Sequence, residues 1–232
     1  MNPFLLPVLA AQGLYVRWST ESLPPAGGPV TGVYGDEAEA RRVLRVAVVG
    51  ESTAAGVGVE RHADGFTGQF ARALHERTGH PVAWSVAGLN GATLEGMRSQ
   101  LLPTVEPGQT VAVLLAGVND VLRRRDPREW GRELAAVAGT LADRAEHVVV
   151  TGVPPFGEFP ALPGTLRRYL AARAAALDEV SRQVCADLPT VTWSGVTGVL
   201  PMGPDFFARD RFHPSAHGYA QWAGIVAGQV AP

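Results

Sequence analysis

The sequence contains a single cysteine, Cys185, among its 232 residues. One thiol cannot form an intramolecular disulfide, and Cys185 falls in a stretch with a helical pattern, so we interpret it as an inert buried side chain. A surplus of charge of one sign is also missing, because 20 basic and 22 acidic side chains give a formal net charge of −2. Without an overall field, the chain is not expected to bind nucleic acid or an anionic polymer.

The sequence also lacks an apolar run long enough to cross a bilayer. Its amino terminus, MNPFLLPVLAAQGLYVRWS, has an apolar stretch of about 14 residues that contains Pro7 and has no leading Lys or Arg. We expect a segment that packs on the protein or lies on a membrane surface, in preference to an atypical or truncated export signal. A cytoplasmic location is therefore favoured over export or membrane association.

The start of the chain differs in composition from the rest. Residues 20–40 are rich in Pro, Gly and acidic side chains, which predicts an irregular arm. No internal repeat or low-complexity tract follows, and the length and the hydrophobic content of 46% suit one large domain. We therefore divide the chain into an N-terminal arm at 1–40 and one domain at 41–232.

Short valine-rich runs alternate with longer segments of helical character along this domain. Near-continuous apolar runs are typical of strands in a parallel sheet that is covered on both faces. The alternation predicts a doubly wound, flavodoxin-like three-layer α/β sandwich with a five-stranded, mainly parallel sheet. The expected strands are 42–50, 81–88, 110–117, 147–153 and 189–193, and the expected helices are about 65–78, 93–102, 127–144, 164–187 and 214–230.

Ser52 directly follows the first of these strands, in the stretch RVAVVGESTAAGVGV at residues 45–59. A serine at a helix start is commonly an N-cap. The same place suits a nucleophile, because backbone N–H groups at a helix start stabilise developing negative charge. Ligands of doubly wound sheets bind beyond the carboxyl ends of the strands, so the choice depends on the residues at the other strand ends.

A candidate base lies near the other end of the chain, in DRFHPSAHGYAQW at residues 210–222. Asp210 can accept the proton of one ring nitrogen of His213 and leave the other nitrogen to act as a general base. Pro214 is expected to be the first residue of the last helix, which places His213 on the loop before it. The alternatives are an Asp–His pair that only bridges the loop, and a metal site of Asp210, His213 and His217, which the break at Pro214 disfavours.

Two further strand ends carry residues that could bind an oxyanion. Asn119, in AGVND, has a side-chain amide that could donate to it, although Asn-Asp after a strand is also common in turns. Gly88 and Gly91, in AGLNGAT, permit close approach of the backbone to a substrate, although turn geometry alone explains such a pair. The four features together supply a nucleophile, oxyanion donors and an oriented base, which is the set that acyl transfer needs.

These motifs resemble those of the SGNH hydrolase superfamily, also called GDSL-type esterases and lipases, over residues 42–230. The similar blocks are GES at 50–52, GLNGAT at 88–93, GVND at 117–120 and DRFHP at 210–214. The resemblance implies a serine hydrolase with a catalytic triad and a three-donor oxyanion hole. The implied triad is Ser52, His213 and Asp210, and the implied oxyanion donors are the N–H of Ser52, the N–H of Gly91 in preference to Gly88, and the side chain of Asn119.

The sequence departs from this family's first block at two positions. Glu51 stands where Asp is usual and Thr53 where Leu is usual, which leaves the role of the Glu51 carboxylate open. An ordinary α/β-hydrolase fits less well, because GESTA lacks the second glycine of G-x-S-x-G and the acid lies only three residues from the histidine.

We therefore expect a serine esterase that hydrolyses small-molecule carboxylic esters with small or medium acyl groups. The two-step mechanism needs no metal and no organic cofactor. The loop at 153–164 is expected to lie beside the site, where Phe156 and Phe159 either line an acyl or alcohol pocket or plug the loop from below. An O-acyltransferase or a carbohydrate deacetylase would use the same site, and a non-catalytic ligand-binding relic would keep only the fold.

Overall fold

The computed structural model describes residues 5–36 and 42–230 and contains a six-stranded sheet. Its strand order is β1-β3-β2-β4-β5-β6, in which the five strands β2 to β6 are parallel and β1 is antiparallel to β3. The strands are β1 (Thr31–Tyr34), β2 (Leu44–Gly50), β3 (Val82–Gly88), β4 (Gln109–Leu115), β5 (Ala145–Thr151) and β6 (Val191–Ser194).

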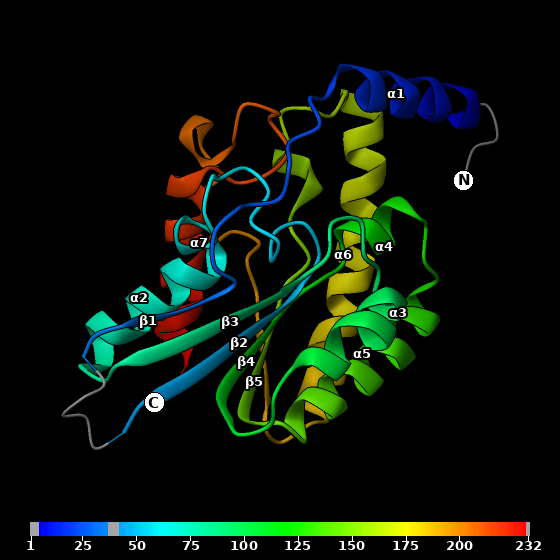
Figure 1. Cartoon of the computed structure of the whole chain (residues 1–232). Coiled ribbons are helices and arrows are strands. Elements are labelled where there is room, and N and C mark those ends of the chain that lie inside the picture. Colours follow the sequence, from blue (N-terminus) through cyan, green and yellow to red (C-terminus); the bar gives the residue numbers. More distant parts are fainter. Residues whose placement is uncertain (1–4, 37–41, 231–232) are drawn as a thin grey trace.

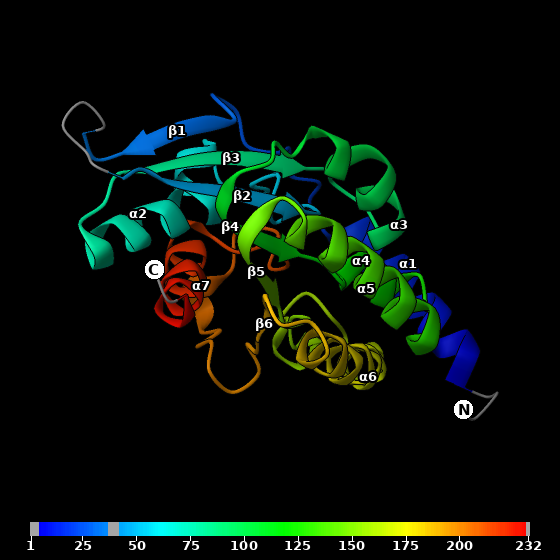
Figure 2. The same cartoon turned by 90° about the horizontal axis from the view of Figure 1, so that it is seen from below.

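Helices cover both faces of this sheet, as Figures 1 and 2 show. On one face lie α2 (Phe66–Thr78) and α7 (Ala216–Gln229), which pack on each other. On the other face lie α5 (Pro127–Ala142) and α6 (Gly164–Ala186). The valines of the central strands face both helical layers and are fully buried, which is why the strands are almost continuously apolar. The prediction of a three-layer α/β sandwich is confirmed.

The sheet has one strand more than the sequence predicted. Residues 31–34 form the edge strand β1, with Thr31 opposite Ser85 and Tyr34 opposite Val82, so the segment 20–40 is not irregular throughout. Four residues are too few for a clear alternation of polar and apolar side chains, and the strand is only half-buried, so the pattern carried little signal. The division of the chain at 40/41 stays a prediction.

Two helix predictions need correction, and one short helix was not predicted. The expected helix at 93–102 is a short α3 (Leu94–Gly96) that continues as a π-helical segment at 97–101 and a 3-10 turn at 102–104. The helix α7 begins at Ala216 and not at Pro214, because the Ser215 hydroxyl caps it by accepting from the N–H of Gly218 at 3.1 Å. An unexpected short helix, α4 (Val118–Leu122), directly follows the third of the predicted strands.

The N-terminal apolar segment forms the helix α1 (Leu6–Ser19), which lies across the first turns of α6 (Figure 1). The side-chain oxygen of Gln12 accepts from the N–H of Leu166 in the first turn of α6 at 2.8 Å. Among residues 5–36 and 42–230, no helix is both long and apolar enough to cross a membrane. The contact with α6 shows that the segment packs on the protein, which is one of the two roles expected for it.

Candidate active site

Three of the predicted site residues lie in the connections that follow adjacent strands of the sheet. The strands β3, β2 and β4 are neighbours, so their carboxyl ends bring Gly91, Ser52 and Asn119 to the same edge. A backbone hydrogen bond of 3.0 Å from the N–H of Leu89 to the carbonyl of Gly50 joins two of these loops. No helix begins at Ser52, however, because residues 52–58 form consecutive turns before α2, and the N-cap interpretation is therefore wrong.

Ser52, His213 and Asp210 form a hydrogen-bonded chain. The Nε2 atom of His213 lies 3.0 Å from the Oγ atom of Ser52, and its Nδ1 atom lies 2.6 Å from the Oδ2 atom of Asp210. Ser52 and Asp210 are buried, whereas the His213 side chain keeps an exposed fraction of 18%. The serine hydroxyl therefore has a base within reach of its proton, and the base is held by a carboxylate on its other side.

The turn at residues 210–213 holds this carboxylate in place. The Oδ1 atom of Asp210 accepts from the N–H groups of Phe212 at 2.9 Å and His213 at 3.0 Å, while Arg211 between them adopts a left-handed conformation with φ of 59°. Burial raises the pKa of Asp210, but these bonds and the one from the His213 ring outweigh it, so the pKa lies below its usual value. Asp210 is therefore a carboxylate at neutral pH and fixes the His213 tautomer.

Two backbone N–H groups at this edge are available to an oxyanion. Within the described residues, the N–H groups of Ser52 and Gly91 donate to no protein acceptor. Gly91 has a φ of +79°, a conformation that favours glycine, and its carbonyl accepts from the Arg123 guanidinium at 3.1 Å. Gly88 packs too closely to carry a side chain, because a Cβ atom there would lie 2.4 Å from the backbone N of Ala55.

The Glu51 carboxylate binds the start of α4. Its Oε1 atom accepts from the N–H of Val118 at 2.9 Å, and its Oε2 atom accepts from the N–H of Asn119 at 3.0 Å and from the Nδ2 atom of Asn119 at 2.5 Å. One of the two amide hydrogens of Asn119 is thus used by Glu51, and the other stays available to a substrate. Glu51 therefore positions Asn119, a role that the sequence left open.

Glu51 is an unusual carboxylate because its side chain is buried. Burial raises its pKa to about 7, although the hydrogen bonds from Asn119 and Val118 act in the opposite direction. All three groups that face the carboxylate are donors, so they favour the ionised form. The conflict between burial and these donors makes Glu51 the titratable group to follow at this site.

A small, mostly apolar cavity of about 20 Å³ lies beside Ser52 and His213. Phe159 and Phe212 line it, and their rings are in edge contact at 5.1 Å. Phe156 does not line the cavity. It is fully buried and stacks on Phe159, with 5.0 Å between the ring centroids. One of the two phenylalanines considered from the sequence thus lines the site, and the other supports it from below.

His217 does not join the other two residues of the alternative metal site. It is exposed on the first turn of α7, whereas Asp210 and His213 bind each other. The described part of the chain, residues 5–36 and 42–230, contains no group of three His, Cys, Asp or Glu side chains arranged to hold a metal ion.

The fold and these motifs define the class of the protein. The profile of the GDSL-like lipase/acylhydrolase family matches residues 48–221, which is more than half of the chain, and the chain belongs to this family. It is accordingly an ester hydrolase of the GDSL type.

Individual relatives agree with this class. The chain is 29% identical to a GDSL-like esterase of Mycobacterium tuberculosis over 233 residues, which cover 93% of this chain and 67% of the relative. The solved structure of TesA is similar with a TM-score of 0.61 and 23% identity, covering 78% of this chain and 95% of TesA. The solved structure of a lipase/acylhydrolase from Enterococcus faecalis is similar with a TM-score of 0.60 and 21% identity, and the match covers 80% of this chain and 94% of that protein. The two structures support the fold.

Proposed function

We propose that this protein is a serine esterase that hydrolyses carboxylic esters of small or medium acyl groups. His213, oriented by Asp210, takes the proton of Ser52 as the Ser52 oxygen attacks the ester carbonyl carbon. His213 then gives this proton to the departing alcohol, which leaves Ser52 acylated. A water molecule, deprotonated by His213 in turn, attacks the acyl-enzyme. As the acid leaves, His213 returns this proton to the Ser52 oxygen.

The developing oxyanion is held by three donors in this proposal. They are the N–H groups of Ser52 and Gly91 and the second amide hydrogen of Asn119. The support comes from the two N–H groups without a protein acceptor and from the three bonds by which Glu51 holds Val118 and Asn119.

One observation carries the proposal more than any other, namely the relay of 2.6 Å and 3.0 Å from Asp210 through His213 to Ser52. The sequence places its ends 158 residues apart (210 − 52), so no local structural need explains the contact. The small cavity beside Ser52 supports a small group at the reacting carbonyl.

The test is a kinetic comparison of wild type, Ser52→Ala and Ser99→Ala on p-nitrophenyl acetate. Ser99 is exposed and bonds only to carbonyls of its own helical segment, so its removal controls for the loss of a serine hydroxyl. We expect Ser52→Ala to lose at least about 1,000-fold in kcat and Ser99→Ala to keep the wild-type rate. Equal rates for wild type and Ser52→Ala would refute the proposal.

A transferase would use the same residues, so the products decide between the two activities. Wild type incubated with p-nitrophenyl acetate and added alcohols should release acetate as the main product. Acetylated alcohol as the main product at low alcohol concentration would assign the protein to the acyltransferases instead.

A further inference from the structure

The helix α1 is apolar around most of its circumference, and yet none of its residues is fully buried. Arg17 is its one charged residue, and on its outer side Leu14, Tyr15 and Trp18 are 69%, 58% and 85% exposed. A helix of this composition is usually buried on all sides. The contacts of α1 are thus incomplete, on its inner side as well as on its outer side.

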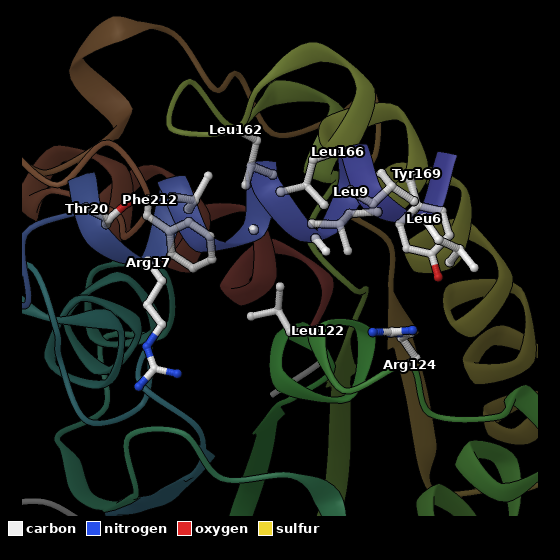
Figure 3. A pocket seen from close by; sticks show the side chains of 14 residues that line it. Leu6, Leu9, Arg17, Thr20, Leu122, Arg124, Leu162, Leu166, Tyr169 and Phe212 are labelled. Carbon is white, nitrogen blue, oxygen red and sulfur yellow. The ribbon is translucent and has the colours of Figure 1, made fainter. Parts of the chain in front are cut away.

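A groove of about 450 Å³ lies between the inner side of α1 and parts of α6 and α4 (Figure 3). This volume is typical of a pocket for a small molecule. The α1 residues that line it recur from Leu6 to Arg17, a distance of about 17 Å along the helix axis at 1.5 Å per residue. The walls are mostly carbon, with Leu6, Leu9 and Val16 on α1, Leu166 and Tyr169 on α6, and Leu122 on α4. Arg17 and Arg124 add two cationic side chains to the lining.

The groove borders the catalytic residues at one end. Phe212 lines both the groove and the small cavity that contains Ser52 and His213, and its ring lies 5.3 Å from the His213 ring. Leu122 lines the groove one helical turn after Asn119. The two spaces therefore lie on either side of one phenylalanine ring.

We propose that this groove binds the alkyl chain of the ester substrate, with α1 as its outer wall. The inference rests on the proposed esterase function. The cavity beside Ser52 is too small for more than a few atoms, so a longer chain has to leave it, and the groove offers the adjoining apolar surface. Its mostly apolar lining, which runs along much of α1, fits an alkyl chain.

Other occupants fit the groove less well. A second copy of the chain or a lipid surface would contact the outer side of α1, where Leu14, Tyr15 and Trp18 lie, and would leave the groove open. The family match at residues 48–221 does not include α1, so this wall is an addition to the matched region.

Gly13 offers a way to fill the groove without touching a residue of the triad. It lines the groove from the middle of α1, and a Cβ atom there would meet nothing within 4 Å. The variant Gly13→Phe should fold, because phenylalanine is a better helix former than glycine. The matched control is Ala11→Phe, which adds the same ring to the same helix at an exposed position that does not line the groove.

The experiment measures kcat/KM for p-nitrophenyl acetate, butyrate, octanoate and dodecanoate, and for a parallel series of alkyl acetates. We expect wild type and Ala11→Phe to gain roughly three- to fourfold per buried methylene in one of the two series. Gly13→Phe should lose at least about tenfold on the long esters of that series and keep the wild-type rate on p-nitrophenyl acetate. The series that responds tells whether the chain belongs to the acyl or to the alcohol part.

Two outcomes overturn the inference. One is a Gly13→Phe variant whose kcat/KM follows wild type at every chain length, and the other is a wild type whose kcat/KM does not rise with chain length in either series.

Binding of the fluorescent fatty acid cis-parinaric acid to the Ser52→Ala variants of all three proteins gives a readout that does not need turnover. Weaker binding in the Gly13→Phe background alone would support the groove even if no ester were hydrolysed, which separates this inference from the proposed function. Equal binding in all three backgrounds would count against it.

Discussion

The buried carboxylate of Glu51 predicts how the stability of this protein depends on pH. The variant Glu51→Gln keeps the size of the side chain and removes its charge. In the folded protein the pKa of Glu51 is about 7, against 4.5 for an ordinary glutamate. Between pH 4.5 and about pH 7, the folded state therefore keeps a proton that the unfolded chain has already released. The resulting stabilisation is complete below pH 4.5 and is lost as the pH rises through about 7.

The magnitude follows from this difference in pKa. A shift from 4.5 to about 7, at about 1.4 kcal/mol per unit, corresponds to roughly 3 kcal/mol in the free energy of unfolding, of which about 2.5 kcal/mol falls between pH 5 and pH 8.5. The glutamine side chain of the variant has no proton to lose in this range. The variant should therefore gain about 2.5 kcal/mol relative to wild type between these two pH values, whatever constant cost the lost hydrogen bonds add.

Urea unfolding followed by circular dichroism at pH 5, 6, 7 and 8.5 measures the free energy of unfolding of both proteins. The other titratable groups are the same in both, so their contributions cancel in the difference between wild type and variant. The variant Glu106→Gln, which removes an exposed carboxylate, serves as the control and should give a curve parallel to wild type. Parallel curves for wild type and Glu51→Gln would show that Glu51 does not carry a raised pKa and would refute the reasoning.

Three further variants test single contacts of the site and the core. Asp210→Asn should lower kcat on p-nitrophenyl acetate by about 1,000-fold or more with an unchanged far-ultraviolet spectrum, because His213 would lose the acceptor that fixes its tautomer; a loss below tenfold would argue against that role. Gly91→Ala should cost about 1–2 kcal/mol in urea unfolding, since its φ of +79° strains an alanine although the Cβ atom has room. Ser181→Ala should cost about 1–3 kcal/mol, because the buried indole N–H of Trp130, now 2.9 Å from the Ser181 hydroxyl, would lose its acceptor; an unchanged urea midpoint would contradict this.

Most of the fold was predictable from the pattern of apolar residues. The five parallel strands and the helices α2, α5, α6 and α7 all lie within a few residues of their predicted positions. In α6 the pattern was clearest, because Leu166, Leu170, Ala174 and Leu177 recur on one face, and all four are buried. Long periodic segments carry their own signal, whereas β1 and α4, with four and five residues, do not.

The residues of the candidate site could be proposed from the sequence, but the contacts that hold them in place could not. The motifs around Ser52, Gly91, Asn119 and His213 each lie at a strand or helix end, where a local reading of the sequence can find them. The three bonds from the start of α4 to Glu51 join residues 67 and 68 positions apart, and no periodicity marks such a pair.

The sequence by itself determined the parallel sheet and the order of the chemical groups along its edge, because both follow from local periodicity and short motifs. Only the tertiary structure decided what surrounds them. It turned the expected helix start at Ser52 into a series of turns, assigned Glu51 to Asn119, and set α1 over an apolar groove beside Phe212. These features depend on contacts between residues that are far apart in the chain. Such contacts form only when the helices pack on the sheet.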